Sequence, residues 1–190
     1  MTALAYKFLA RGARGPISAY PWPRPEGGAP GAWSPETPRP ALCHDGVHAC
    51  RRDDLAYWLH EELWRIELDG DLEIAAEADC VVARRGRLLQ RFDAWSEGGV
   101  AQAFAAAARD HAAQVVAGHV ANAALAAYVE DASRHVRNGY PESPALAALC
   151  AAMAVARTGP DDEIEDRFRG ERAWQSGWIA SALALPQDEG

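Results

Sequence analysis

Apolar and charged residues alternate in the segment Leu-Trp-Arg-Ile-Glu-Leu-Asp at residues 63–69. Trp64, Ile66 and Leu68 fall on one face, and the intervening charged residues fall on the other. A period of two is typical of a half-buried strand. Asp69 and Gly70 follow, and glycine there suits a turn with positive φ. The pattern therefore predicts a strand that ends in a tight turn.

Three other short segments carry the same β-forming character. They are residues 5–9 (Ala-Tyr-Lys-Phe-Leu), residues 79–83 (Asp-Cys-Val-Val-Ala) and residues 87–92 (Arg-Leu-Leu-Gln-Arg-Phe). Turn residues separate them at short intervals, which favours antiparallel pairing. We expect a small, mainly antiparallel sheet.

The segment Arg-Arg-Asp-Asp-Leu-Ala-Tyr-Trp-Leu-His-Glu-Glu-Leu switches to helical spacing. Leu55, Trp58 and Leu59 recur at i, i+3 and i+4, as on one face of a helix. Asp53 or Asp54 is suited to cap the amides of the first turn. The segment predicts one short helix within the strand-rich half, with Trp58 turned inward.

From Val100 onward alanine dominates at helical spacing, and Ser-Glu-Gly-Gly at residues 96–99 marks the change. One packed helix is expected up to the turn at residues 138–144. Two shorter helices should follow, at residues 145–156 and residues 161–185. The last of these carries an apolar stripe of Ile164, Phe168, Trp174 and Trp178.

The fold class is therefore α+β, with a small sheet and one short helix followed by an all-α half packed on it. We divide the chain into an α+β domain, residues 1–96, and a helical domain, residues 97–190. The linker is too short to separate them far. So many alanines let helices approach closely, which fits either a tight bundle or a homodimer through the Ala-rich helices.

Residues 15–40 hold most of the prolines and cannot form regular structure, yet they contain Tyr20, Trp22 and Trp33. Such a loop either packs on its own domain or places its aromatic rings around a ligand. Both interpretations stay open at the level of sequence.

Composition and charge narrow the function classes. The net charge of −8 argues against a nucleic-acid-binding protein. Nothing reaches the ~18 uninterrupted apolar residues of a membrane span, and the N-terminus has no signal-peptide pattern. We therefore expect a cytoplasmic protein with no membrane partner, in which the cysteines stay reduced.

Residues 42–50, Leu-Cys-His-Asp-Gly-Val-His-Ala-Cys, bring together two cysteines and two histidines, the side chains best suited to catalysis or metal binding. If Asp45 and Gly46 form a hairpin turn, Cys43, His48 and Cys50 share one face. A zinc site would need a fourth ligand that no nearby motif supplies, so no metal is predicted. A nucleophilic Cys-His pair is the second interpretation. A hydrogen-bonded core histidine is the third.

The helical half offers two more histidines, His111 and His119. They are eight residues apart, so one helix would hold them about 12 Å apart along its axis. One metal ion cannot bridge that distance.

Ala-Tyr-Lys-Phe-Leu, Gly-Pro-Ile-Ser and Trp-Pro, followed by the Gly-Val-His-Ala-Cys strand, resemble a family of uncharacterised bacterial proteins. In that family the strand precedes an acidic-Leu helix and an apolar strand. The resemblance covers the first half of the chain and implies a shared fold without an established activity. The same order of strand, helix and strand also resembles the ADP-ribosyltransferase and RNA phosphotransferase folds. That second likeness implies that His48 lies beside the nicotinamide ribose of NAD.

We expect a small enzyme whose pocket lies between the sheet and the helical half. His48 is the candidate general acid or base, because its ordinary pKa of ~6.5 suits proton transfer at neutral pH, and Cys43 and Cys50 join it as catalytic candidates. The substrate-binding candidates are the aromatic residues Tyr20, Trp22, Trp33 and Trp58. The partner is a small organic molecule, and no cofactor is predicted. The alternatives are a non-catalytic ligand-binding or protein-interaction module and a divergent NAD-binding protein.

Overall fold

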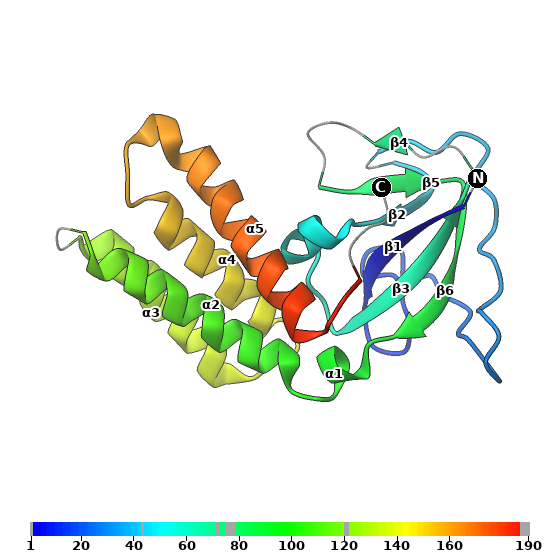
Figure 1. The fold of residues 1–190 in the computed structure, drawn as a ribbon, viewed down its shortest axis with the longest axis horizontal. Coiled ribbons are helices and arrows are strands. Elements are labelled where there is room, and N and C mark those ends of the chain that lie inside the picture. The colour runs from blue at the N-terminus through cyan, green and yellow to red at the C-terminus, as the bar shows by residue number, and fades with distance from the viewer. Residues whose placement is uncertain (1, 43, 71–72, 75–78, 120–121, 187–190) are drawn as a thin grey trace.

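A computed structural model describes residues 2–42, 44–70, 73–74, 79–119 and 122–186. The described strands lie in the first half of the chain with one short helix among them, the other described helices follow, and the two halves lie side by side (Figure 1). The strands are β1 (Thr2–Leu9), β2 (Val47–Ala49), β3 (Glu62–Asp69), β4 (Glu73–Ile74), β5 (Val81–Ala83) and β6 (Arg85–Arg91). The helices are η1 (Arg52–Tyr57), α1 (Asp93–Ser96), α2 (Val100–Ala117), α3 (Ala123–Asn138), α4 (Ser143–Ala156), η2 (Asp161–Glu163) and α5 (Ile164–Ala182). The α+β fold class expected from the sequence is confirmed.

The larger sheet has β3 at its centre, with β1 and β6 antiparallel on either side. The alternation seen in the sequence decides which side chains face which layer. Trp64, Ile66 and Leu68 are buried on one face, as predicted. On the other face Tyr6 and Phe8 of β1 belong to the core that the helices cover. Both faces of this sheet are therefore buried, by different partners.

The second sheet has the order β2-β5-β4 and joins the first at one point. There Tyr6 and Cys50 exchange two backbone hydrogen bonds of 2.9 and 2.8 Å. β5 also runs through Arg84 directly into β6. The inner faces of the two sheets meet so closely that a Cβ on Gly86 would lie 3.0 Å from the side chains of Val47 and Ile66. That distance is shorter than an ordinary van der Waals contact, so these two side chains would have to shift if residue 86 carried a side chain.

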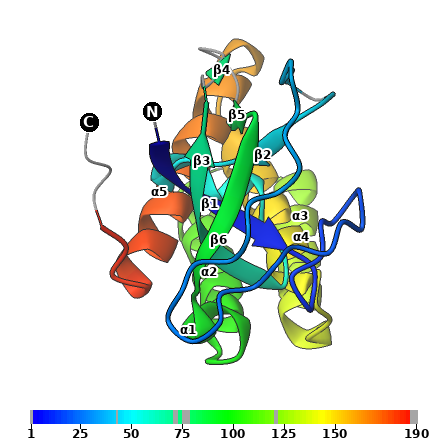
Figure 2. The same cartoon turned by 90° about the vertical axis from the view of Figure 1, so that its right-hand side faces the viewer.

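The Pro- and Trp-rich loop packs on its own half of the molecule. Backbone amides of Gly31, Ser34 and Thr37 donate to carbonyls along β6 and just before it, at 2.8 to 2.9 Å. The loop thus pairs with the outer edge of β6 without being a regular strand, and this edge is no longer open for pairing with another chain. Figure 2 shows it running beside β6, with the helices behind the sheet.

The helical half and the larger sheet share one hydrophobic core. Trp95 packs against Phe8 at 5.4 Å and against Phe104 at 5.9 Å between ring centroids, so rings from β1, α1 and α2 meet there. Ile179 of α5 completes this core. The helical half therefore docks on the sheet, as expected. None of the described helices is both long enough and apolar enough to cross a bilayer.

Two elements differ from the sequence prediction. The long helix expected after Val100 is divided into α2 and α3, because Gly118 ends the first and the Asn122 side chain caps the second by accepting from the Ala124 amide at 2.9 Å. The short helix is a 3-10 helix without a side-chain cap. Asp54 accepts a hydrogen bond from Arg51 instead, at 2.7 Å.

Candidate functional site

His48 lies on β2, opposite Val82 of β5. The hairpin expected around Asp45 and Gly46 would have placed it opposite Cys43. Instead Asp45 turns back on Ala41, with two backbone hydrogen bonds of 2.9 and 3.1 Å, and β2 pairs with β5. Cys43 lies outside the described residues, so its predicted place beside His48 stays a prediction.

The His48 side chain is half-buried, and its Nδ1 lies 3.3 Å from the Gly46 carbonyl oxygen. Burial lowers the pKa of His48, and the nearby charge of Lys7 lowers it further, against the effect of that carbonyl. The Lys7 ammonium also donates to the backbone carbonyl of His48 at 2.5 Å. Burial lowers the Lys7 pKa to about 8. His48 is therefore favoured in its neutral form.

Cys50 is fully buried, and its thiol donates to the Tyr6 carbonyl oxygen at 3.4 Å. Burial and the charge of Asp54 raise the pKa of Cys50 far above its ordinary value. A thiolate is the nucleophilic form of cysteine. The environment of Cys50 in the folded protein therefore does not favour the nucleophilic role considered for it.

The four candidate aromatic residues do not surround one space. Trp22 is buried, with Tyr20 edge-on at 5.4 Å and the Lys7 ammonium at 5.1 Å from its ring centroid. Trp33 instead contacts the guanidinium groups of Arg85 and Arg87 on β6, at 4.9 and 4.6 Å. The prediction that Trp58 turns inward is wrong: Trp58 is 39% exposed just after η1, and its indole donates to the Asp79 carbonyl. The structure thus brings Tyr20 and Trp22 near Lys7, which joins them to the β2 backbone, and places the other two elsewhere.

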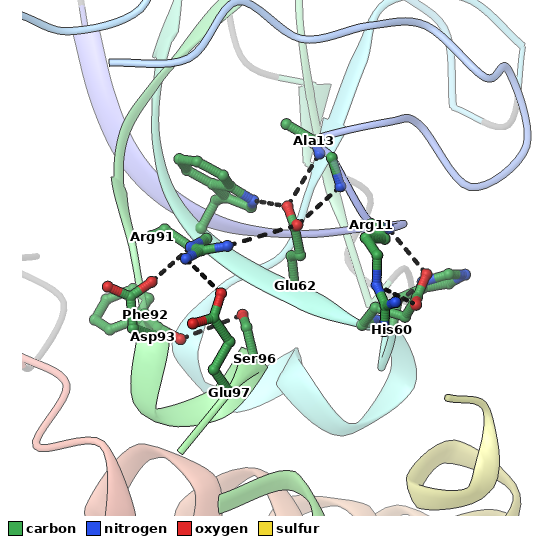
Figure 3. A network of polar contacts seen from close by, with 12 residues as sticks. Arg11, Ala13, His60, Glu62, Arg91, Phe92, Asp93, Ser96 and Glu97 are labelled. Carbon is green, nitrogen blue, oxygen red and sulfur yellow. Dashed lines mark hydrogen bonds and ion pairs between the residues drawn. The ribbon is translucent and has the colours of Figure 1, made fainter. Parts of the chain in front are cut away.

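A cleft of about 420 Å³ lies where the end of the larger sheet meets the helical half. The sequence predicted a pocket between these halves, although the lining differs from the residues proposed. The lining residues are Arg11, His60, Glu61, Glu62, Arg91, Trp95, Ser96, Glu97, Gly99, Ala101, Gln102, Gly139, Tyr140, Pro141 and Pro144. Figure 3 shows the polar network on the sheet side of this cleft.

Glu62 at the start of β3 organises this network. Its carboxylate accepts hydrogen bonds from the backbone amides of Gly12 and Ala13 at 2.9 and 3.0 Å, and from the Trp64 indole at 3.0 Å (Figure 3). Arg91 Nη1 lies 3.8 Å from Glu62 Oε1. Glu62 is only 6% exposed, so these donors stabilise its charge in a site with little water.

Arg91 extends the network towards solvent. Its Nε donates to Asp93 at 2.5 Å, and its Nη2 donates to Glu97 at 2.7 Å. With Glu62, three carboxylates surround this one guanidinium (Figure 3). Arg91 is therefore held in place and largely neutralised, and its role is to fix the wall of the cleft.

His60 presents one ring nitrogen as a hydrogen-bond donor. The Glu61 backbone amide donates to His60 Nδ1 at 2.9 Å. Because Nδ1 accepts, the neutral ring carries its hydrogen on Nε2. The His60 carbonyl accepts from the Trp95 indole at 2.9 Å, which fixes the backbone beneath the ring.

Arg11 and the start of α2 add further donors. Arg11 Nε lies 3.5 Å from Glu61, and its side chain is 83% exposed. α2 begins after Gly99, whose φ is +82°, and its first turn has neither a side-chain cap nor an acidic residue. Its first amides therefore lack side-chain partners, and Ala101 and Gln102 of that turn line the cleft.

A second buried polar group lies in the helical half. His111 of α2 stacks on Trp174 with ring centroids 3.9 Å apart, and its Nδ1 lies 2.9 Å from a Glu171 oxygen. Gln175 donates to Glu171 at 3.2 Å and to the Ala148 carbonyl at 3.0 Å. The group ties α5 to both α2 and α4.

Replacing Glu171 with glutamine should remove part of the pH dependence of stability. Burial raises the Glu171 pKa above its ordinary 4.5, although His111 opposes this. The folded state then holds that proton more tightly than the unfolded state, so the contribution to stability is complete below about pH 4.5 and is lost as pH rises through the folded pKa. Urea unfolding at about pH 4 and pH 7 measures the free energy of unfolding of both proteins. The stability of Glu171→Gln relative to wild type should be higher at pH 7 than at pH 4.

Glu165→Gln is the matched control for this experiment, because Glu165 is exposed on the same helix and pairs with Arg169. Its difference from wild type should stay constant with pH. An equal pH trend in both variants would contradict the role given to the buried pair.

Sequence reasoning missed Lys7, His60, Glu62 and Glu171. Lys7 carried a signal, because it stands between Ala5 and Leu9 on the inward face of β1. The Glu171 contact joins helices far apart in sequence, and no local pattern encodes it.

No group of three described His, Cys, Asp or Glu residues is placed to hold a metal ion. The likenesses suggested by the Gly-Val-His-Ala-Cys strand remain predictions, and the chemistry of the cleft is the evidence on function. Comparisons with protein-family models, with curated proteins and with solved structures find no match to this chain.

Proposed function

We propose that this protein is a small enzyme that binds a small organic molecule with a carbonyl or carboxylate oxygen in the cleft between its halves. The supporting observation is that hydrogen-bond donors from three separate elements line one cleft. These donors are the His60 imidazole, the Arg11 guanidinium and the first amides of α2. A site built at the junction of two structural layers is a common place for a ligand.

The cleft offers more free hydrogen-bond donors than free acceptors, and this indicates which class of ligand it would bind. Arg91 is already neutralised by its carboxylates, and Glu62 is already occupied by backbone amides and an indole. In the described part of the chain, the side chains of Gln102 and Tyr140 make no hydrogen bond or ion pair. An oxygen with partial or full negative charge is the group that such donors complement.

His60 is the proposed acid–base partner in this cleft. A neutral imidazole with its hydrogen on Nε2 can donate to a carbonyl oxygen and stabilise the charge that develops there. Glu61 is the adjacent carboxylate, with one oxygen 3.9 Å from His60 Nδ1, and its side chain is partly exposed. In the proposed step the Glu61 carboxylate takes up a proton from a carbon next to a carbonyl group, while His60 Nε2–H donates to that carbonyl oxygen and stabilises the enolate that forms.

A panel of small carboxylic and 2-oxo acids tests binding and catalysis separately. The expected result is a set of amide chemical-shift changes around Gly99, Ala101 and Glu61 for at least one acid. That acid should also exchange its C–H hydrogen in deuterated water, followed as loss of its proton signal. His60→Ala should slow the exchange by at least about 100-fold, which is the size of a typical acid–base contribution.

His48→Asn is the matched control, because His48 is the histidine that the sequence indicated. Exchange that survives His60→Ala and is lost in His48→Asn would move the site to β2. Binding at the cleft without exchange would make the protein a ligand-binding module. Shift changes elsewhere, or none, would overturn the proposal.

A further inference from the structure

Cys50 directly follows β2 and Cys80 directly precedes β5. The two strands pair Val47 with Ala83, His48 with Val82 and Ala49 with Val81. Continued by one residue, this register would place Cys50 opposite Cys80. Opposed residues of an antiparallel pair point to the same face, so in that register the two thiols would lie on the same side of the sheet.

The backbone of Cys50 determines the type of this pair. Its N–H donates to the Tyr6 carbonyl and its own carbonyl accepts from the Tyr6 amide, at 2.8 and 2.9 Å. Both groups therefore point towards β1, away from β5. In the continued register Cys50 and Cys80 would form a non-hydrogen-bonded pair, a type whose Cα atoms are typically about 4.5 Å apart. A disulfide spans Cα separations of about 4.4 to 6.8 Å.

Two observations independent of the register agree with this placement. Both residues are buried, with 1% and 4% exposure. The charge of Cys80 is also one of the causes that raise the pKa of Cys50, so the two sulfurs lie within electrostatic reach of each other. They are placed to react with each other more readily than with a large external reagent.

We propose that Cys50 and Cys80 are a disulfide-forming site, which closes when the chain meets a disulfide oxidant of the glutathione type. This inference does not depend on the proposed function of the cleft. It concerns a pair of strands that the cleft does not include.

The reaction balances as two thiol–disulfide exchanges. One cysteine thiolate attacks a sulfur of glutathione disulfide, breaks its S–S bond and releases glutathione, which takes up a proton. The other cysteine thiolate then attacks the protein sulfur of the mixed disulfide, forms the protein S–S bond and releases a second glutathione. The two protein thiols lose two protons and two electrons, and glutathione disulfide accepts both.

Burial of the two thiols limits the rate of this reaction. The pairing of β2 with β5 determines which two cysteines are joined. In the folded protein the first attack needs local opening, so the reaction should be slow. During refolding the thiols are accessible and the native register brings them together. The disulfide should then raise the midpoint of thermal unfolding by roughly 10 °C, because it closes a long loop in the unfolded chain.

The test uses the full chain with Cys43→Ser and Cys150→Ser, so that only one pair remains. The reduced protein is unfolded, refolded in a buffer of reduced and oxidised glutathione, alkylated in denaturant and digested. Mass spectrometry should find the peptides of Cys50 and Cys80 joined, and separated by a reducing agent. Thermal unfolding with and without that agent should show the shift in midpoint.

A one-residue shift of the thiol is the matched control. Cys80→Ala with Val81→Cys moves the thiol to the opposite face of β5, and the link should be lost. The proposal is overturned if Cys50 and Cys80 remain separate thiols after refolding, if each keeps a bound glutathione, or if the shifted variant links equally well. The wild-type chain should give the same Cys50–Cys80 link, and a link from Cys43 to either residue in its place would also overturn it.

Discussion

Replacing Trp95 with alanine should lower the free energy of unfolding by about 3 to 5 kcal/mol, the usual cost of truncating a buried aromatic residue. Trp95 is 2% exposed and packs between Phe8 of β1 and Phe104 of α2. Its indole also donates to the His60 carbonyl at 2.9 Å. Urea unfolding followed by circular dichroism measures the loss.

The same residue tests whether the two halves unfold together. Because Trp95 belongs to a core that contains side chains of both halves, its loss should weaken a single cooperative transition and not release one half. Trp58→Ala, at a tryptophan that is 39% exposed, serves as control and should cost much less. A Trp95→Ala variant that unfolds in two separate steps, or that loses less than about 1 kcal/mol, would contradict the shared core.

The sequence was sufficient to predict elements whose pattern is local. The alternation around Trp64, Ile66 and Leu68 identified a strand and its buried face, because side chains of a strand alternate whatever its partners are. The change to alanine after Gly99 identified the helical half for a similar reason. These predictions are confirmed by the positions of β3 and α2.

Pairing between distant segments was not predictable in this way. The turn at Asp45 and Gly46 reads locally as a hairpin, yet β2 pairs with β5. The hydrogen bonds of a strand can be satisfied equally well by a neighbour in sequence or by a distant strand. Tertiary packing decides between them, and here β5 lies so close that a Cβ added to Gly46 would be 2.9 Å from the Ala83 carbonyl oxygen and from the Val82 side chain. The residue that lies opposite His48 in the sheet therefore could not be predicted from the residues next to it in sequence.

The residues that line the cleft were missed for a related reason. Its walls come from segments near residues 11, 60, 91, 100 and 140, which are separated along the chain. The sequence indicated only that a pocket should lie between the halves. Glu62 appeared as one acidic residue in Glu-Glu-Leu-Trp, and its role depends on amides that are contributed by a turn fifty residues earlier.

The contact between Glu62 and that turn, at Gly12 and Ala13, gives the second prediction with a large effect on stability. Replacing Glu62 with alanine should cost about 3 to 5 kcal/mol, because buried donors lose their acceptor and each unsatisfied group costs about 1 to 3 kcal/mol. The donors are the amides of Gly12 and Ala13 and the Trp64 indole. Gly12 and Ala13 have positive φ values of 78° and 56°, a conformation that the carboxylate helps to hold.

Replacing Glu62 with glutamine distinguishes the contribution of the side chain's shape to stability from that of its charge. Glu62→Gln keeps the size of the side chain but turns an NH₂ group towards at least one of the donors, so it should still cost about 2 kcal/mol. Glu61→Gln is the matched control, since the Glu61 side chain is partly exposed and accepts one exposed backbone amide, that of Arg11 at 2.9 Å. Its ion pair with Arg11 is also at the surface, where such pairs contribute little. Chemical denaturation of the three variants should give the order Glu62→Ala, Glu62→Gln, Glu61→Gln from least to most stable. Equal stability of Glu62→Gln and wild type would mean that the turn is held by its own backbone, and the wall of the cleft would then not depend on the buried carboxylate.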